Sequence, residues 1–183
     1  MTHQEHVSLI KPAFPRKGGV WADFGSGDGA FTLALADILG KEAKIYSVDK
    51  DSSRLSHQKE HFSKQFPQAK VEYIVHDLGK FLALGGLDGV VMANLLHFFK
   101  DEQSSPLSKQ KILANIKKVL KPKGKLIIVE YNVDEGNTWV PYPVSFESLK
   151  ILLPENGFSS PKLLKTIPSY YLKEIYSSLS TNL

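Results

Sequence analysis

Short apolar runs that end in Gly, Asp or Asn recur along this chain, and each is followed by a segment whose apolar residues have helical spacing. This alternation is typical of βα units that wind around a parallel sheet. The run at residues 87–93 is almost wholly apolar, as expected for a strand buried on both faces of such a sheet. The runs that predict parallel strands are Val20–Phe24, Lys44–Val48, Val71–Val75, Leu87–Ala93 and Lys125–Val129.

Helices are expected between these strands. Phe31, Leu35 and Leu39 repeat with helical spacing, and Gly40 then ends the segment. Ser105-Pro106 has the residue types of a helix start, a capping hydroxyl followed by proline. The expected helices are Ala30–Leu39, a segment from residues 51–53 to Pro67, and a segment from Ser105-Pro106 to Lys121–Gly124.

The C-terminal part has a different pattern. Ser145 can cap a helix over Phe146–Leu153, and two further apolar runs follow at Lys162–Ile167 and Tyr170–Tyr176. Only Pro168-Ser169 separates these two runs, which is too short for a crossover helix, so we expect them to pair antiparallel. The last run can also be interpreted as a helix. The predicted fold class is α/β, with a doubly wound, mostly parallel sheet that ends in an antiparallel hairpin.

Length and composition indicate one ordinary domain over residues 1–183, large enough to bury a core. The chain has no cysteine, which excludes disulfides, thiolate metal sites and a cysteine nucleophile. Without evidence for an oxidising compartment, a cytoplasmic location is the default expectation. Residues 1–15 do not have the pattern of a signal peptide, and no run approaches the ~20 apolar residues of a membrane span.

The formal net charge of +4 comes from lysines that are spread along the chain. The densest group, Lys117 to Lys125, lies at the end of a predicted helix, where cations interact favourably with the helix dipole. A nucleic-acid partner is therefore not expected.

The segment Asp23–Gly29, which joins the first strand to the first helix, contains glycine at every second position. Such glycines permit a tight turn and a close ligand, and the following helix directs free N–H groups at that ligand. A plain strand-to-helix turn also favours glycine, but three alternating glycines here favour a nucleotide-like ligand. Gly25-x-Gly27-x-x-Ala30 also satisfies a loose dinucleotide fingerprint, and Asp49 could hold the ribose of either kind of cofactor.

Polar residues end the predicted strands, and ligands of open α/β sheets bind at that edge. A buried carboxylate at Asp23 is costly unless it is paired. A pyrophosphate would repel this carboxylate, whereas the ammonium group of a methionyl moiety would suit it. The residues expected to gather on this rim are Asp23, Asp49, Asp77, Asn94 and Glu130.

Taken in order, these motifs resemble those of class I S-adenosylmethionine-dependent methyltransferases, especially the small ubiquinone/menaquinone-type (methyltransferase type 11) branch. The matching segments are Val20–Gly29, Ser47–Asp49, His76–Leu78, Gly89–Phe98 and Val119–Glu130. The resemblance implies a Rossmann-like seven-stranded sheet with strand order 3-2-1-4-5-7-6. It also implies an enzyme with S-adenosylmethionine as cofactor, no metal, and a small-molecule acceptor.

The resemblance further implies roles for the residues of the glycine segment. Asp23 would face the methionyl amine directly or through water, and Gly25, Ser26 and Gly27 would contact the methionyl end by their backbone. Asp49 would accept hydrogen bonds from both ribose hydroxyls.

The other cofactor contacts are implied in the same way. Lys50 would lie beside the adenine, Asp77 would accept a hydrogen bond from its amino group, and Leu78 would pack near the ring. Asn94 and Leu95 would line the sulfonium side. Asp77 can alternatively be a simple turn or capping residue.

Members of this family usually cover the acceptor with an N-terminal helical segment or an insertion, and this chain has little of either. The covering segment would be Met1–Lys17, the Gly136–Pro143 loop, a partner subunit in a homodimer, or nothing.

Three residues near the predicted acceptor side are candidates for catalysis: His97, which follows the fourth strand, and the aromatic residues Tyr131 and Tyr142. A general base is needed only if the acceptor must lose a proton. His57 and His61 have the i, i+4 spacing of metal ligands, but they lack a third ligand and a solvated helix face is the better interpretation.

Two other functions compete with methyl transfer. A nicotinamide-dependent oxidoreductase would usually show a helical Tyr-x-x-x-Lys pair or a second domain, and neither is evident. A non-catalytic cofactor-binding module would fit the sparse cover, but the intact acidic positions count against it. The expected reaction is an in-line displacement at the methyl carbon.

Overall fold

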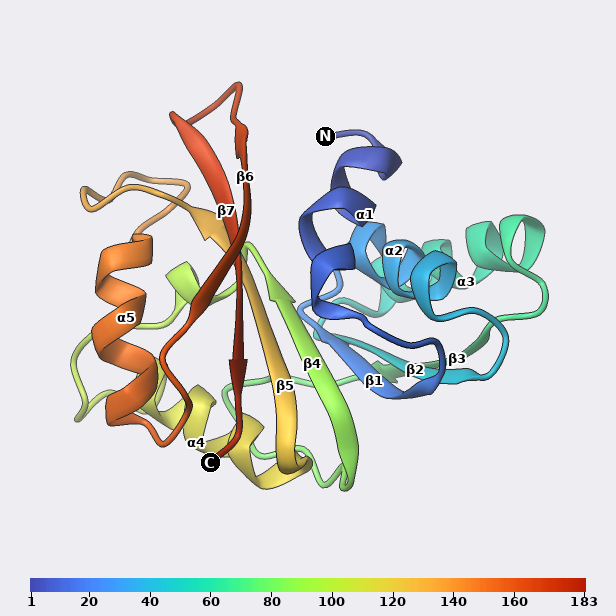
Figure 1. Cartoon of the computed structure of the whole chain (residues 1–183), viewed down its shortest axis with the longest axis horizontal. Coiled ribbons are helices and arrows are strands. Elements are labelled where there is room, and N and C mark those ends of the chain that lie inside the picture. Colours follow the sequence, from blue (N-terminus) through green and yellow to red (C-terminus); the bar gives the residue numbers. More distant parts are fainter.

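The computed structural model describes residues 1–183 and contains one sheet of seven strands in the order β3-β2-β1-β4-β5-β7-β6 (Figure 1). Strands β1 to β5 are parallel to one another, and β7 pairs antiparallel with both β5 and β6. The predicted sheet and its C-terminal hairpin are therefore confirmed. The strands are β1 Gly19–Phe24, β2 Ala43–Asp49, β3 Lys70–Val75, β4 Leu87–Ala93, β5 Leu120–Tyr131, β6 Lys162–Pro168 and β7 Glu174–Thr181.

Helices cover both faces of the sheet, as a doubly wound fold requires (Figure 1). On one face, α1 (His3–Ile10), α2 (Ala30–Leu39) and α3 (Ser52–Gln65) enclose an apolar cluster. On the other face, α4 (Lys109–Val119) and α5 (Phe146–Glu155) enclose a second cluster. This arrangement leaves the carboxyl ends of β1 to β4 open at one edge of the sheet.

The N-terminal segment is part of the packed structure. Thr2 and Glu5 form a capping box at the start of α1, and Leu9 and Ile10 at its end are fully buried. The Ser177 hydroxyl of β7 donates to the Leu9 carbonyl at 2.6 Å. Helix α1 therefore fixes the C-terminal hairpin to the helical layer above β1 and β2.

Two predicted boundaries around α4 are wrong. Ser105-Pro106 does not start the helix, because Ser108 is the cap and its hydroxyl accepts from the Lys111 amide at 3.3 Å. The preceding segment is held by a backbone bridge between Lys100 and Ser108.

Strand β5 begins at Leu120 and not at Lys125. Leu120 pairs directly with Leu87, whereas Lys125 pairs with Gly89. The helix already ends at Val119, and residues 121–124, which were expected to end it, form a bulge within β5 in which Lys123 adopts a φ of 62°.

The last strand was also placed too early. It runs over Glu174–Thr181 and not over Tyr170–Tyr176, and residues 169–173 form the connection, with Tyr170 and Tyr171 exposed at its tip. The apolar pattern did not indicate the second half of this strand, because its buried positions there are largely serines, which pack against the neighbouring strand and α1. The alternative helix over this run is not formed.

The lysines near the end of α4 bind groups of the chain itself. Lys117 Nζ donates to the Gly157 carbonyl at 3.0 Å, Lys121 pairs with Asp88 at 2.6 Å, and Lys125 donates to a carbonyl of the N-terminal segment. None of the helices has the length and apolar character needed to cross a membrane.

Candidate cofactor-binding site

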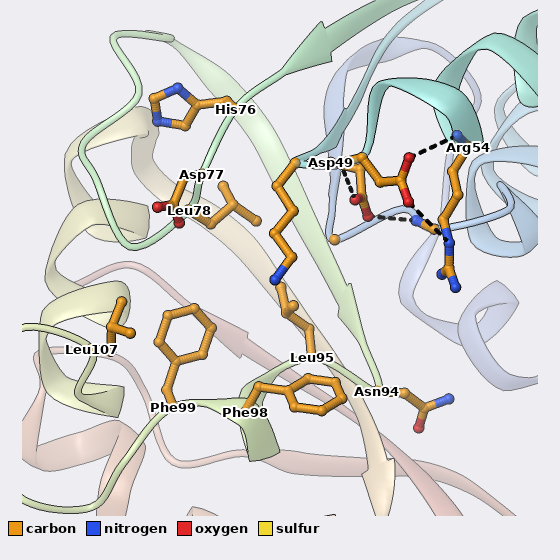
Figure 2. A pocket seen from close by; sticks show the side chains of 14 residues that line it. Asp49, Arg54, His76, Asp77, Leu78, Asn94, Leu95, Phe98, Phe99 and Leu107 are labelled. Carbon is orange, nitrogen blue, oxygen red and sulfur yellow. Dashed lines mark hydrogen bonds and ion pairs between the residues drawn. The ribbon is translucent and has the colours of Figure 1, made fainter. Parts of the chain in front are cut away.

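A cavity of about 450 Å³ opens at the carboxyl ends of β1 to β4, where ligands of open α/β sheets bind. Acidic and basic side chains, among them Asp49 and Arg54, lie on one side of it, and Phe98, Phe99 and Leu107 lie on the other (Figure 2). The lining residues are Gly25, Gly27, Asp49, Lys50, Asp51, Arg54, His76, Asp77, Leu78, Asn94, Leu95, Phe98, Phe99 and Leu107.

The glycine segment forms a tight loop between β1 and α2. Gly25, Gly27 and Gly29 have φ values of 73°, 53° and 86°, in the left-handed region that favours glycine. The Gly25 amide donates to the Val48 carbonyl at 2.8 Å, which ties the loop to β2. A Cβ at Gly25 would lie 2.7 Å from the Leu95 side chain, so this glycine also permits close packing within the protein.

Asp49, at the end of β2, connects the glycine loop to the start of α3. Its Oδ2 accepts from the Gly27 amide at 2.8 Å, and its Oδ1 accepts from the Asp51 amide at 2.9 Å (Figure 2). Asp51 in turn caps α3 by accepting from the Ser53 and Arg54 amides. The Asp49 carboxylate is therefore held at the cavity by backbone groups from both sides.

Asp77 follows β3 and is a turn residue that also lines the cavity. Its Oδ1 accepts from the Gly79 amide at 2.9 Å, which is the hydrogen bond of a turn residue. The same side chain lines the cavity beside Leu78 and opposite Phe99 and Leu107 (Figure 2). The turn thus fixes a carboxylate next to an apolar wall.

Asn94, directly after β4, has a strained backbone with a φ of 50°. Its side-chain Oδ1 is buried without a hydrogen-bond partner, and the residue lines the cavity (Figure 2). Buried polar atoms normally have partners. Because this oxygen is buried from solvent, it lies behind the cavity surface, and the strained backbone of Asn94 is held in place by its surroundings.

Asp23 and Ser26 lie beneath the glycine loop and do not line the cavity. Asp23 Oδ2 accepts from the Thr32 hydroxyl at 2.6 Å, and Ser26 Oγ lies 2.8 Å from Ser47 Oγ. Burial raises the pKa of Asp23 to about 7, although the hydrogen bonds from Thr32 lower it. The other eight predicted cofactor contacts, Gly25, Gly27, Asp49, Lys50, Asp77, Leu78, Asn94 and Leu95, all line the cavity.

His97 lies in a short 3₁₀ helix next to the cavity-lining residues and forms a buried pair with Glu130, the last-but-one residue of β5. His97 Nδ1 is 2.7 Å from Glu130 Oε2, and Glu130 Oε1 accepts from the Leu96 amide at 2.7 Å. The Tyr142 amide donates to the His97 carbonyl, and the Tyr131 ring lies 6.4 Å from the imidazole. The three catalytic candidates are therefore brought together.

Residues 15–164 match a family model described as a methyltransferase domain. The chain belongs to this methyltransferase family. The resemblance on which the sequence prediction depended is thereby confirmed.

Solved structures with low sequence identity share the fold of this methyltransferase. One is an S-adenosylmethionine-dependent methyltransferase from Aquifex aeolicus, with a TM-score of 0.73, 19% identity, and coverage of 98% of this chain and 90% of that one. One from Methanosarcina mazei has a TM-score of 0.72, 16% identity, and coverage of 95% and 97%. An arsenic(III) S-adenosylmethionine methyltransferase from Chlamydomonas reinhardtii has a TM-score of 0.71, 16% identity, and coverage of 92% and 65%. No curated protein sequence matches the chain.

Several cavity residues of this methyltransferase were missed from the sequence. Asp51 was expected only at the start of a helix, and Arg54 was not singled out, although a residue three positions after a helix cap faces the same way as the cap. Phe98, Phe99 and Leu107 gave no signal, because an apolar cavity wall has the same composition as core.

The two histidines with metal-ligand spacing, His57 and His61, are exposed on α3. No group of three or more His, Cys, Asp or Glu side chains in the structure is arranged to hold a metal ion. Neither Met1–Lys17 nor Gly136–Pro143 contributes a residue to the lining of the cavity.

Proposed function

We propose that this methyltransferase transfers a methyl group from S-adenosylmethionine to a small-molecule acceptor. The observation that carries the proposal is the meeting of the glycine loop, the Asp49 carboxylate and the Asp77 carboxylate at one cavity. Membership in the methyltransferase family supports the interpretation of this cavity as the cofactor site.

The residues present fit this cofactor. The Asp49 oxygens each accept one backbone hydrogen bond, and a carboxylate has about four acceptor sites, so capacity is left for two ribose hydroxyls. Asp77 has a second oxygen that can accept from the adenine amino group, and Leu78 lies beside it. The cavity volume lies within the range of about 300–1,000 Å³ usual for small-molecule sites.

The protein's main task in an in-line displacement is alignment. When bound, S-adenosylmethionine supplies a methyl group that its sulfonium charge has already activated. Asn94, Leu95 and Phe98 lie between the cofactor cavity and the His97 side, and we assign them the positioning of the two reactants. Orientation of this kind can contribute about 7–11 kcal/mol to lowering a barrier.

His97 is proposed to accept the proton of an acceptor that carries one. Because Glu130 accepts the hydrogen bond of Nδ1–H, the lone pair of the neutral imidazole is on Nε2. Tyr131 flanks the same place, and burial together with the charges of Glu130 and Tyr171 raises its pKa, so it is protonated and neutral at pH 7. Tyr131 and Tyr142 are proposed to form the apolar floor for the acceptor.

Calorimetry and thermal unfolding with S-adenosylmethionine, S-adenosylhomocysteine and NAD test the proposed cofactor. S-adenosylmethionine and S-adenosylhomocysteine should bind and raise the free energy of unfolding, by about 2.7 kcal/mol at a hundred times the dissociation constant. NAD should not bind. Asp49→Ala should abolish the effect, whereas Asp134→Ala, at an exposed site outside the cavity, should not. Stabilisation by NAD alone would support the oxidoreductase, and no binding at all would support a non-catalytic module.

Replacing Tyr131 and Tyr142 together with alanine tests the acceptor floor. An acceptor is first identified by release of S-adenosylhomocysteine in a panel of phenols, amines, thiols and carbon acids. The double variant should raise the KM for this acceptor by about tenfold or more, the cost of losing a few kcal/mol of apolar contact. The dissociation constant of the cofactor should change less than threefold; an equal loss in both would contradict the assignment.

A further inference from the structure

Gln58 is a buried polar residue on a helix whose other polar side chains are in solvent. Helix α3 turns three side chains inward, Leu55, Gln58 and Phe62, and Gln58 is only 2% exposed. A glutamine at this depth is stable only where its amide groups find hydrogen-bond partners. Two of those partners belong to the glycine loop and one to β2.

The side-chain amide of Gln58 joins three segments that are distant in sequence. Its Nε2 donates to the Gly27 carbonyl at 2.5 Å and to Ser26 Oγ at 3.0 Å. Its Oε1 lies 2.8 Å from Ser47 Oγ on β2. Both amide hydrogens and the amide oxygen are therefore used, and two of the three bonds hold the loop that lines the cavity.

Gln58 also accounts for the third glycine of the loop. A Cβ at Gly29 would lie 2.8 Å from Gln58 Oε1, and Gly29 has a left-handed φ of 86°. The space beneath Gly29 is thus filled by the protein's own side chain and not by a ligand. Gly25 and Gly27 therefore line the cavity, whereas Gly29 leaves room for the Gln58 side chain on the opposite side of the loop.

We infer that Gln58 is a positioning residue for the cofactor, which acts by holding the Gly25–Gly27 backbone in its binding conformation. The inference depends on the proposed function. A partly buried carbonyl at Gly27 that lost its donor would be left unpaired within the protein, and the loop would relax to satisfy it. The required property is the N–H donor, because a carboxylate of the same size would place an oxygen against the Gly27 carbonyl.

The Gln58→Glu variant separates hydrogen-bond donation from packing. An ionised glutamate cannot donate to Gly27, whereas a protonated one can, so the variant should recover cofactor affinity as the pH is lowered. The groups that face this position are Asp28 of the loop, Asp23 of β1, Asp49 of β2, Arg54 of α3, and His57, Glu60, His61 and Lys64 of α3. Because these groups are also present in the wild type, the readout is the ratio of the dissociation constants of the variant and the wild type at each pH.

The experiment measures binding of S-adenosylhomocysteine by calorimetry at pH 5.5, 7.0 and 8.5. Gln58→Leu should weaken binding by about tenfold at every pH, the value of one buried hydrogen bond. At pH 8.5, Gln58→Glu should bind at least as weakly as Gln58→Leu. At pH 5.5, its affinity should approach that of the wild type. The control Gln65→Glu adds the same charge at an exposed site of α3 and should follow the wild type throughout.

Hydrogen exchange of the unliganded protein at pH 7.0 provides a readout that needs no ligand. The amides of residues 25–29 should exchange faster in Gln58→Leu than in the wild type and Gln65→Glu, while those of β4 keep their protection. Unchanged exchange in the loop, or an affinity ratio for Gln58→Glu that does not vary with pH, would overturn the inference. If the wild type binds no S-adenosylhomocysteine, the proposed function fails. Hydrogen exchange of residues 25–29 still decides whether Gln58 holds the glycine loop in place.

Discussion

Asp23→Asn is expected to stabilise the unliganded protein at pH 8 and to weaken its binding of S-adenosylmethionine. Asp23 is almost fully buried in β1, and its only side-chain hydrogen-bond partner is the Thr32 hydroxyl. Asparagine has the same shape and can accept this hydrogen bond, but it carries no charge to bury. Stability and cofactor affinity should therefore change in opposite directions at this position.

The sign of the stability change follows from proton binding. Burial raises the pKa of Asp23 from 3.8 to about 7, so between these values the folded state binds a proton that the unfolded chain has released. Stability from this group is fully present below pH 4 and is lost as the pH rises through 7. About three pKa units at 1.36 kcal/mol each give up to about 4 kcal/mol.

Urea unfolding at pH 4.5, 6 and 8 measures this effect. The variant and the wild type should have similar free energies of unfolding at pH 4.5, and the variant should gain up to about 4 kcal/mol by pH 8. Asp134→Asn, at an exposed site, should show no such trend. A variant that is less stable than the wild type at pH 8 would mean that hydrogen bonds outweigh burial and that the carboxylate is ionised at neutral pH.

Cofactor binding should respond to the same carboxylate with the opposite sign. The family resemblance predicts a methionyl ammonium near Asp23, and such a cation would favour the ionised form. Wild-type affinity should then fall by about tenfold between pH 8 and pH 6, as the carboxylate takes up a proton. Asp23→Asn should bind about 10- to 100-fold more weakly at pH 8, because the negative charge that attracts the ammonium from beneath the loop is lost, and should lose this pH dependence.

The parts of the fold that the sequence predicted are those where hydrophobic periodicity and turn residues agree. Apolar runs identified β1 to β5, because a parallel strand buried on both faces must be nearly continuous in apolar residues. Strand β7 lacks this signal: Ser177, Ser178 and Ser180 are buried. Small hydroxyl side chains can be buried when they donate to a nearby carbonyl, as Ser177 does to Leu9. That compensation exists only after distant segments have come together.

The candidate site likewise contains residues that the sequence predicted and residues that it did not. Strand ends that carry Asp49, Asp77 and Asn94 were predicted to meet, because the topology alone determines which edge they share. Gln58 was not predicted, since one glutamine on a helix rich in polar residues has no distinctive local pattern. Its role depends on a contact with a loop 31 residues earlier in the chain. Periodicity indicates which face of a helix is buried, but not which polar residue a neighbouring backbone will recruit.

Glu130→Gln is expected to reduce turnover by about 10²- to 10³-fold, the usual contribution of general-base catalysis, while leaving cofactor binding intact. Glu130 accepts hydrogen bonds from the Leu96 amide and from His97 Nδ1. In the variant, the amide oxygen can keep the bond from Leu96 while the amide NH₂ group faces His97. The imidazole would then accept at Nδ1 and carry its proton on Nε2, so it could no longer take a proton from the acceptor.

The measurement is kcat with the acceptor identified by the panel, alongside the dissociation constant for S-adenosylhomocysteine. Glu135→Gln, at an exposed site outside the cavity, is the matched control. His97→Asn should lose as much activity as Glu130→Gln, and the double variant should lose little more, because the two residues act as one unit. Additive losses would show that Glu130 acts by anchoring the Leu96 amide and not through the imidazole. Full turnover in Glu130→Gln would mean that the acceptor reaches the methyl group already deprotonated, and His97 would then be only a wall of its site.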